Sequence, residues 1–293
     1  MSNERYSPSG FGILPPVVKN LIIINVLFFL ATIVLGKTMN IDLTDYFGLH
    51  YLASQKFAPY QFITYMFMHD TESFAHIFFN MFALWMFGSV LENVWGPKKF
   101  LFYYIVTGVG AALVHYLVFY FQISPVLGNI DAFLAKPDLS ALMQFASNHQ
   151  FVIRDSSGEI FQGFELFKQN YTTLQQNPGN MQAMQESVNF ITAYREYFLN
   201  LPVVIGASGA IYGLLLAFGM LFPNSLIYLY FFIPMKAKWF VIIFGLFELG
   251  SGFFDSGSNV AHFAHLGGMI FGFFLIIYWK HKADKHRNKN YWQ

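Results

Sequence analysis

Two polar side chains that could exchange a proton stand in separate apolar runs of the 293-residue chain. Ser208 lies in Gly206-Ala207-Ser208-Gly209, and His265 lies at a matching depth in a later run. Polar residues surrounded by hydrocarbon are costly and tend to be functional. A hydroxyl and an imidazole take part in acid–base chemistry when they approach to about 3 Å. The sequence therefore points to chemistry inside a lipid bilayer, and to the segments that must bring these two side chains together.

The composition indicates a membrane protein before any motif is considered. Hydrophobic residues make up 55% of the chain, aromatic residues 20% and charged residues only 11%, whereas a soluble domain carries roughly 25% charged residues. The apolar residues are gathered into runs of spanning length, which predicts an all-α polytopic membrane protein rather than soluble domains. The net charge of +1 indicates no class of partner, and the absence of cysteine excludes disulfides and thiol chemistry.

Six apolar runs are long enough to cross a bilayer. The opening segment, residues 1–10, lacks an apolar core followed by a small-residue cleavage site, so the first run is expected to remain in the protein. An even number of spans places both termini on one side. The predicted spans are residues 17–35, 74–94, 100–121, 202–222, 239–254 and 260–279.

The spans divide the chain into four predicted parts. These are a membrane domain with spans 1–3 in residues 1–121, an extramembrane helical insertion in residues 122–201, a membrane domain with spans 4–6 in residues 202–280, and a basic tail in residues 281–293. Within the insertion, mixed apolar and polar residues at helical spacing predict helices at 131–149, 163–176 and 181–199. An accessory domain, a cover on the membrane surface and a partner-docking site all remain open for it.

The basic residues predict the orientation of the spans. Eleven lysines and arginines lie on the side of the N-terminus and six on the other side, although the loops there are longer. By the positive-inside rule, both termini are expected in the cytoplasm. The eleven are Arg5, Lys19, Lys98, Lys99, Lys236, Lys238, Lys280, Lys282, Lys285, Arg287 and Lys289, and the six are Lys37, Lys56, Lys136, Arg154, Lys168 and Arg195.

This orientation predicts that several polar side chains share one depth. The second, fourth and sixth spans all start at the outer face, and His76, Ser208 and His265 lie about two, six and five residues into them, which is within roughly 6 Å in depth. Asn80 and Tyr212 each follow one of these residues by four positions, so they lie on the same helix faces. The sequence therefore predicts an outer pocket with a hydroxyl, two imidazoles, an amide and a phenol.

Small residues would let these helices approach closely. Gly206, Gly209 and Gly213 lie on the fourth span, and the sixth span carries a stripe of small residues. Such residues allow close packing of membrane helices. The stripe consists of Ala261, Ala264, Gly268 and Gly272.

Structural explanations stand beside this interpretation. A serine between glycines also serves helix packing, and a membrane histidine also hydrogen-bonds a neighbouring helix. The main intramembrane acids, Glu92 and Glu248, suit helix–helix or interfacial hydrogen bonds better than the polar path of a channel or transporter. A metal site made of His76, His262 and His265 lacks a nearby carboxylate or thiolate, so no metal and no cofactor are expected.

The motifs are similar to those of bacterial rhomboid intramembrane serine proteases. The resemblance rests on three motifs, with supporting matches at Thr64–His69 and Gly88–Glu92. It covers the six-span core in order and leaves the insertion and the tail unmatched, and the first outer loop lacks the Trp-Arg pair of many relatives. The three motifs are His76-Ile77-Phe78-Phe79-Asn80, Gly206-Ala207-Ser208-Gly209 followed by Tyr212, and Ala264-His265-Leu266-Gly267-Gly268 followed by Gly272.

The resemblance implies a role for each matching residue. Ser208 and His265 would form a catalytic dyad, with Tyr212 packed on the imidazole. His76, Asn80 and the backbone N–H of Ser208 would form the oxyanion hole, which agrees with the need of a serine for a base and of an oxyanion for donors.

The same resemblance extends to neighbouring residues. Gly206 and Gly209 would support the site. His265 is preferred to His262 because the glycine spacing of the family follows it, and His69 receives no role.

The resemblance also implies the substrate. Single-pass or other transmembrane proteins would enter sideways between the second and fifth spans and be cut near their outer ends, where the helix is loosened. Phe253 and Phe254 would cap the site, and the residues 255–259 would let the cap move. Membrane lipid is an expected partner and nucleic acid is not. A catalytically dead relative that only binds helices would be expected to lack Ser208 or His265, and this chain has both.

Overall fold

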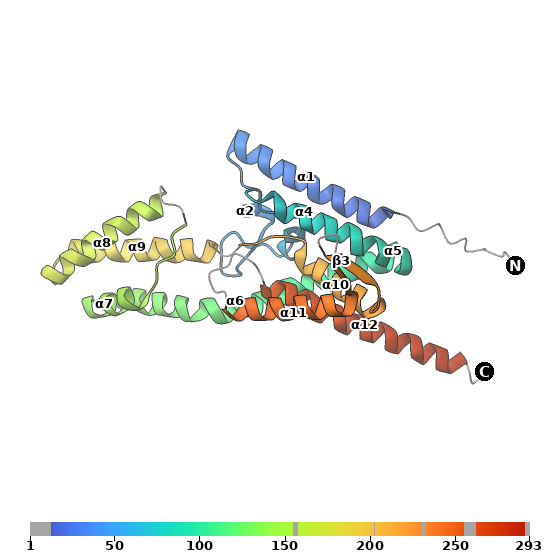
Figure 1. Ribbon diagram of the computed structural model, residues 1–293. Coiled ribbons are helices and arrows are strands. Elements are labelled where there is room, and N and C mark those ends of the chain that lie inside the picture. The colour runs from blue at the N-terminus through green and yellow to red at the C-terminus, as the bar shows by residue number, and fades with distance from the viewer. Residues whose placement is uncertain (1–12, 155–157, 202, 230–232, 255–261, 291–293) are drawn as a thin grey trace. The chain divides into compact units, whose positions relative to one another are not determined.

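A computed structural model describes residues 13–154, 158–201, 203–229, 233–254 and 262–290 (Figure 1). The chain forms two compact units. Unit 1 comprises Met1–Leu49, Ala58–His115 and Val204–Gln293, and unit 2 comprises His50–Phe57 and Tyr116–Val203.

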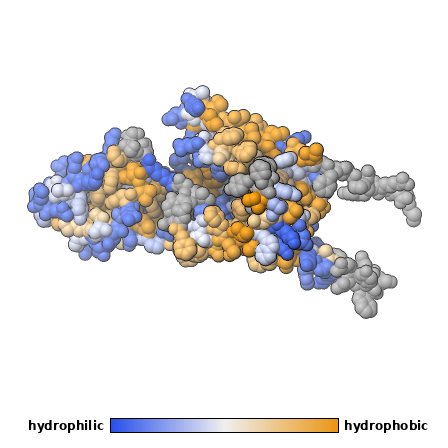
Figure 2. Space-filling view, in the orientation of Figure 1, coloured by the Kyte–Doolittle hydropathy of each residue, from blue (hydrophilic) through white to orange (hydrophobic). Residues whose placement is uncertain are grey.

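Unit 1 is an all-α polytopic membrane bundle. Five helical segments in the described residues are long and apolar enough to span a membrane: Pro16–Met39, Phe74–Trp95, Pro97–Ala135, Ala237–Phe254 and His262–Lys285. Their outward faces remain apolar, as Figure 2 shows over α1 and α11, where Leu27 and Phe247 are exposed. Apolar surface of this extent is expected where helices contact lipid.

The elements that include unit 1 residues follow one another along the chain as helices, short strands and turns. They are α1 Pro16–Met39, α2 Thr44–Phe47, β1 Leu49–His50, α3 Gln61–Thr64, the 3-10 helix η1 Tyr65–Phe67, α4 Phe74–Ala83, the π-helical turn η2 Leu84–Gly88, α5 Ser89–Trp95, α6 Pro97–Ala135, β2 Val203–Val204, α10 Ser208–Leu221, the antiparallel strands β3 Leu226–Leu229 and β4 Ile233–Lys236, α11 Ala237–Phe254 and α12 His262–Asn290.

The fourth predicted span, residues 202–222, is only partly helical. Residues Val203–Val204 are extended, Gly206 has φ +119°, and α10 begins at Ser208 and ends at Leu221. A positive φ is open to glycine and interrupts a right-handed helix. Ser208 is therefore the first residue of a 14-residue helix, and the expectation that it lies six residues inside a helix was wrong.

The short helix α10 packs closely on its neighbours because its contact residues are small. A Cβ atom on Gly213 would lie 2.7 Å from the Cβ of Thr107, and a Cβ on Gly268 of α12 would overlap the backbone of Gly209. The hydroxyl of Tyr103 donates to the carbonyl oxygen of Gly213 at 2.8 Å. Glycine at these positions is what lets α6 and α12 reach α10.

A buried carboxylate accepts hydrogen bonds from the N-terminus of the first span. Glu92 of α5 is 2% exposed, and its two oxygens accept the backbone N–H groups of Val17 and Val18 at 3.0 and 2.8 Å. The first N–H groups of a helix have no partner within it, and the N-terminal end attracts negative charge. The expectation that Glu92 serves helix–helix hydrogen bonding is confirmed.

Unit 2 is built from helices around its own apolar core. Besides part of α6 it contains α7 Leu139–Asn148, α8 Glu159–Gln176 and α9 Met181–Asn200, and α8 lies beside α9 (Figure 1). The fully buried core residues include Ile130, Leu142, Leu174, Ile191 and Tyr194.

Two predicted helix boundaries in unit 2 were wrong. The predicted helix 131–149 is divided at residues 136–138, because Pro137 disfavours helical backbone before it and Asp138 caps α7 by accepting the N–H of Ala141 at 2.8 Å. The helix α8 begins at Glu159 instead of residue 163. The third helix, predicted at 181–199, extends over Met181–Asn200, where Asn180 caps it.

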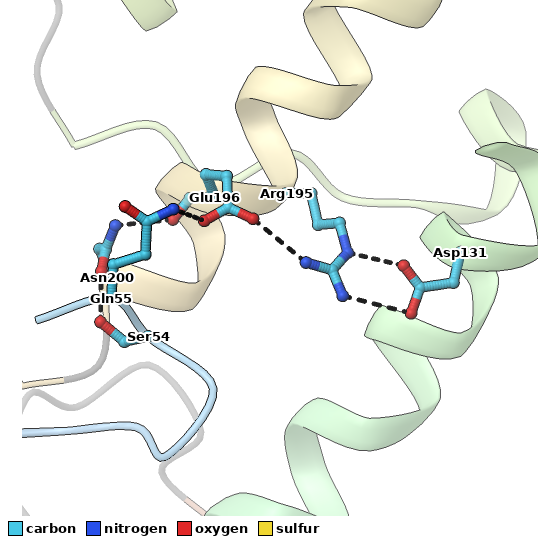
Figure 3. Close-up of polar contacts among 6 residues, drawn as sticks. All are labelled: Ser54, Gln55, Asp131, Arg195, Glu196 and Asn200. Carbon is cyan, nitrogen blue, oxygen red and sulfur yellow. Dashed lines mark hydrogen bonds and ion pairs between the residues drawn. The ribbon is translucent and has the colours of Figure 1, made fainter. Parts of the chain in front are cut away.

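Polar contacts connect separate segments of unit 2 (Figure 3). Arg195 of α9 pairs with Asp131 of α6 at 2.6 Å and with Glu196 at 3.2 Å. The hydroxyl of Ser54 donates to Asn200 at 2.5 Å. These contacts attach the loop 50–57 and α6 to α9, although the exposed ion pairs add little to stability.

Candidate active site

The candidate nucleophile stands at an uncapped helix N-terminus. The N–H of Gly206 donates to the carbonyl oxygen of Tyr65 at 2.9 Å, which fixes the extended segment that leads into α10. Ala207 occupies the N-cap without a side-chain hydrogen bond, and Ser208 follows as the first helical residue. The backbone N–H groups of this first turn have no helical acceptor and form the positive end of the helix dipole.

The structure places Ser208 next to His265. The Oγ of Ser208 lies 2.8 Å from the Nε2 of His265, although 57 positions separate them in the sequence. Ser208 is half-buried, and His265, on α12, is 8% exposed. The close approach of α10 and α12 at Gly209 and Gly268 makes this distance attainable. The predicted approach of the two side chains is therefore present.

Tyr212 packs on the candidate base. Its ring stacks on the imidazole of His265 with centroids 4.3 Å apart and planes 6° from parallel. Tyr212 is one helical turn beyond Ser208, so one face of α10 carries both the hydroxyl and the stacking ring. The phenol hydroxyl donates to the Oε1 of Glu248. The stack and this hydrogen bond together restrict rotation of the His265 ring.

His76 faces the same point from α4. Its Nδ1 accepts the backbone N–H of Asp70 at 3.3 Å, so in the neutral ring the proton is on Nε2. A Cβ atom built on Gly206 would lie 3.0 Å from this Nε2 and 3.6 Å from the Oγ of Ser208. The Nε2 of His76 and the Oγ of Ser208 therefore both lie within 4 Å of one point beside the backbone of Gly206.

Asn80 lies one turn beyond His76 and is buried. Its Nδ2 donates to the carbonyl oxygen of His76 at 2.7 Å. An amide nitrogen carries two hydrogens, so this bond leaves one of them for another acceptor.

His69, for which no role is predicted from the sequence, lies against the site. Its ring centroid is 5.1 Å from that of His76, and the side chain is fully buried. Burial, with His76 as a second cause, lowers the pKa of His69 to about 3. His69 is therefore a neutral packing partner for His76.

The position of Glu248 beside the histidines of α12 was not predicted from the sequence. This carboxylate of α11 is 3% exposed. Its Oε2 lies 2.6 Å from the Nδ1 of His262 and 3.0 Å from the Nδ1 of His265. The expectation that Glu248 makes helix–helix hydrogen bonds is confirmed, but the statement that no carboxylate approaches these histidines was wrong.

The signal for Glu248 was present in the sequence as an ionisable residue inside a span, which is a functional-site hypothesis by default. The sequence does not give the rotation of α11 about its axis, and that rotation decides which residues Glu248 meets. The ligand atoms of Glu248, His262 and His265 lie within 4.8 Å of one another. A carboxylate and two imidazoles are also ligand types for Zn²⁺, whereas His76 does not belong to this group.

Phe253 and Phe254 end α11 with exposed side chains, 69% and 91% accessible. The ring of Phe253 packs edge-on against Phe263 at 5.7 Å. The residues 255–259 and Ala261, on which the expected movement and part of the small-residue stripe depend, lie outside the described residues.

Comparison with known proteins identifies the family. No curated protein matches the chain. A family model described as Rhomboid domain matches residues 56–129 and 182–282, more than half of the chain. The matched residues include Ser208, His265, Tyr212, His76 and Asn80, while residues 130–181 of the insertion lie outside the match. The chain belongs to the rhomboid family, whose members are intramembrane serine proteases.

Proposed function

We propose that the protein is an intramembrane serine endopeptidase that cleaves transmembrane helices of membrane proteins near their outer ends. Ser208 is the nucleophile and His265 is the general base. The observation that carries the proposal is the 2.8 Å distance between the Ser208 Oγ and the His265 Nε2 inside a bundle of membrane helices. Membership of the rhomboid family supports the same reaction.

This geometry supports the following reaction. The Ser208 Oγ attacks the scissile carbonyl carbon while its proton moves to the Nε2 of His265. The tetrahedral intermediate collapses as His265 returns the proton to the leaving amine, and an acyl-enzyme remains on Ser208. A water molecule, deprotonated by His265, then releases the acid product. The stack with Tyr212 holds the imidazole in position through these steps.

We assign three donors to the oxyanion. They are the Nε2–H of His76, the second amide hydrogen of Asn80, and the backbone N–H of Ser208 at the start of α10. Donors aimed at developing charge lower the barrier, and the loss of one such donor costs roughly 100-fold to 1000-fold in rate. Gly206 and Gly209 support the site by keeping His76 and α12 close.

The substrate is a single-pass or other transmembrane protein, and lipid surrounds the reaction. A helical peptide bond is shielded by its own hydrogen bonds, so the substrate unwinds where small or helix-breaking residues loosen it. Access is lateral, between the segment α4–α5 and α11, and Phe253 with Phe254 forms the cap. The reaction needs no cofactor, metal or nucleic acid.

The proposal includes an orientation. Both termini are cytoplasmic, the protein is in the cell inner membrane, and the site opens to the outer or periplasmic side, as the distribution of lysine and arginine predicts. Residues 1–121 and 202–280 form the membrane domain, residues 122–201 the extramembrane insertion, and residues 281–293 the basic tail.

The experiment is labelling of the purified protein with a fluorescent fluorophosphonate, which reacts with activated serine hydroxyls. Wild-type protein is expected to be labelled, and Ser208→Ala and His265→Ala proteins are expected to remain unlabelled. Equal labelling of all three proteins would show that the reacting group is not Ser208 and would remove the basis of the proposal.

A further inference from the structure

Glu248 is a carboxylate buried among the side chains of the candidate active site. Burying an ionised carboxylate is expensive unless hydrogen bonds and charges compensate it. Among the residues that the structure describes, three groups approach its oxygens: the hydroxyl of Tyr212 from α10, and the Nδ1 atoms of His262 and His265 from α12. Two neighbouring helices therefore fix this carboxylate in one place.

The negative charge of the carboxylate favours one tautomer of His265. An ionised carboxylate only accepts hydrogen bonds, so the ring nitrogen that faces it carries a hydrogen. The Nδ1 of His265, 3.0 Å from the Oε2 of Glu248, is then the protonated nitrogen of the neutral ring. The other nitrogen, Nε2, is left unprotonated and faces the Oγ of Ser208 at 2.8 Å. This is the tautomer that a base for Ser208 needs.

We propose that Glu248 is a positioning residue that completes a serine–histidine–glutamate triad with Ser208 and His265. The inference rests on the proposed function. When the Ser208 proton moves to Nε2, the imidazole becomes a cation, and the fixed negative charge of Glu248 stabilises it in a medium of low dielectric constant. No proton moves to Glu248, since the Nδ1 hydrogen stays on His265 throughout.

Without substrate, the contact between the Nδ1 of His265 and the Oε2 of Glu248 is weaker than a well-formed hydrogen bond, so it can strengthen during the reaction. None of the residues that the structure describes gives the Nδ1 of His265 a well-aligned hydrogen bond, although the Oε2 of Glu248 is within ion-pair distance. Catalytic hydrogen bonds are often loosely aligned without substrate and tighten in the transition state. His262, whose Nδ1 is 2.6 Å from the same oxygen, and Tyr212 hold the carboxylate while this occurs.

The first experiment replaces the charge and keeps the shape. Glu248→Gln is expected to lower kcat for cleavage of a reconstituted transmembrane substrate by about 10,000-fold, as loss of the acid does in serine protease triads. KM is expected to stay within about twofold, because Glu248 does not touch the substrate. Glu248→Asp, which restores the charge one methylene away, is expected to recover part of the loss. A loss in Glu248→Gln smaller than 100-fold would overturn the proposal.

Glu92→Gln is the matched control. Glu92 is an equally buried carboxylate, but it caps α1 and has no contact with Ser208 or His265 among the residues described. The Glu92→Gln protein is expected to be less stable than wild-type protein and to keep the wild-type kcat per folded molecule. A loss in both variants of the same size would show that any missing buried carboxylate impairs cleavage, and this would overturn the triad.

The second experiment measures the tautomer in wild-type protein, and a variant serves only to assign the signals. In protein labelled with ¹⁵N-histidine, the signals that disappear in His265→Ala identify His265. The proposal predicts an Nδ1–H tautomer with an unprotonated Nε2. An Nε2–H tautomer at neutral pH would overturn it.

The two proposals fail in different ways. If Glu248→Gln cleaves normally while Ser208→Ala does not, the triad fails and the serine protease stands. If wild-type protein neither cleaves a transmembrane substrate nor reacts with a fluorophosphonate, the proposed function itself fails.

Discussion

The imidazole of His76 lies against the backbone of Gly206, where a Cβ atom would be only 3.0 Å from its Nε2. The same glycine has φ +119° and donates its N–H to Tyr65. One residue thus holds the extended segment before α10, leaves space for a ring from α4, and sets the start of the helix at Ser208. A side chain at position 206 would disturb all three features.

Replacement of Gly206 by alanine is therefore expected to reduce activity strongly. The positive φ costs a non-glycine residue about 1–3 kcal/mol, and the new methyl group would displace His76 from Ser208. The rate of fluorophosphonate labelling is expected to fall at least tenfold. Gly250→Ala is the control, because a Cβ there meets nothing within 4 Å. Equal rates for Gly206→Ala and Gly250→Ala proteins would contradict this account of Gly206.

His69 makes the stability of the fold depend on pH. Burial lowers its pKa to about 3, whereas an unfolded histidine has a pKa of about 6.5. Between these values the unfolded chain binds the extra proton, so stability is complete above pH 6.5 and falls as the pH drops toward 3. The contribution reaches about 1.4 kcal/mol per pH unit. Unfolding midpoints in detergent, measured from pH 7 to pH 4, are expected to fall less in His69→Gln than in wild type; parallel curves would contradict the prediction.

Glu92 is expected to stabilise α1. Glu92→Gln removes the charge at the N-terminus of the helix and leaves one of the N–H groups of Val17 and Val18 without a good acceptor. A buried donor without a partner costs about 1–3 kcal/mol. This loss of stability is expected as a lower free energy of unfolding for the Glu92→Gln protein, measured in mixed micelles. An unchanged value would mean that water or another group replaces the carboxylate.

Replacement of the exposed aromatic pair at the end of α11 tests whether the pair caps the active site. If Phe253 and Phe254 cap the site, the double alanine variant is expected to cleave a transmembrane substrate at the wild-type rate or faster. The pair is largely accessible, with Phe253 touching Phe263, so the bundle is expected to fold. Complete loss of cleavage in a folded variant would argue against a gating role.

Much of the membrane bundle could be predicted from the sequence because each span is a long apolar run, and five of the six predicted runs overlap spanning helices. The predicted end of the third span at residue 121 was wrong, because α6 continues to Ala135. The approach of Ser208 and His265 could be predicted from their similar depth in their spans and from the small residues that let the helices pack closely. Both features can be read from residue spacing alone. The late start of α10 was missed because only the positive φ of Gly206 reveals that the apolar residues 203–205 precede the helix. The place of Glu248 was missed because hydropathy does not give the rotation of α11 relative to α12.

The central claim is that the Ser208–His265 pair cleaves peptide bonds in the membrane. The most direct measurement is cleavage of a purified single-pass substrate in proteoliposomes, with the cut position read by mass spectrometry. Wild-type protein is expected to cut within or beside the transmembrane helix near its outer end, and Ser208→Ala protein is expected to produce no fragment. Fragments of equal yield from both proteins would contradict the account.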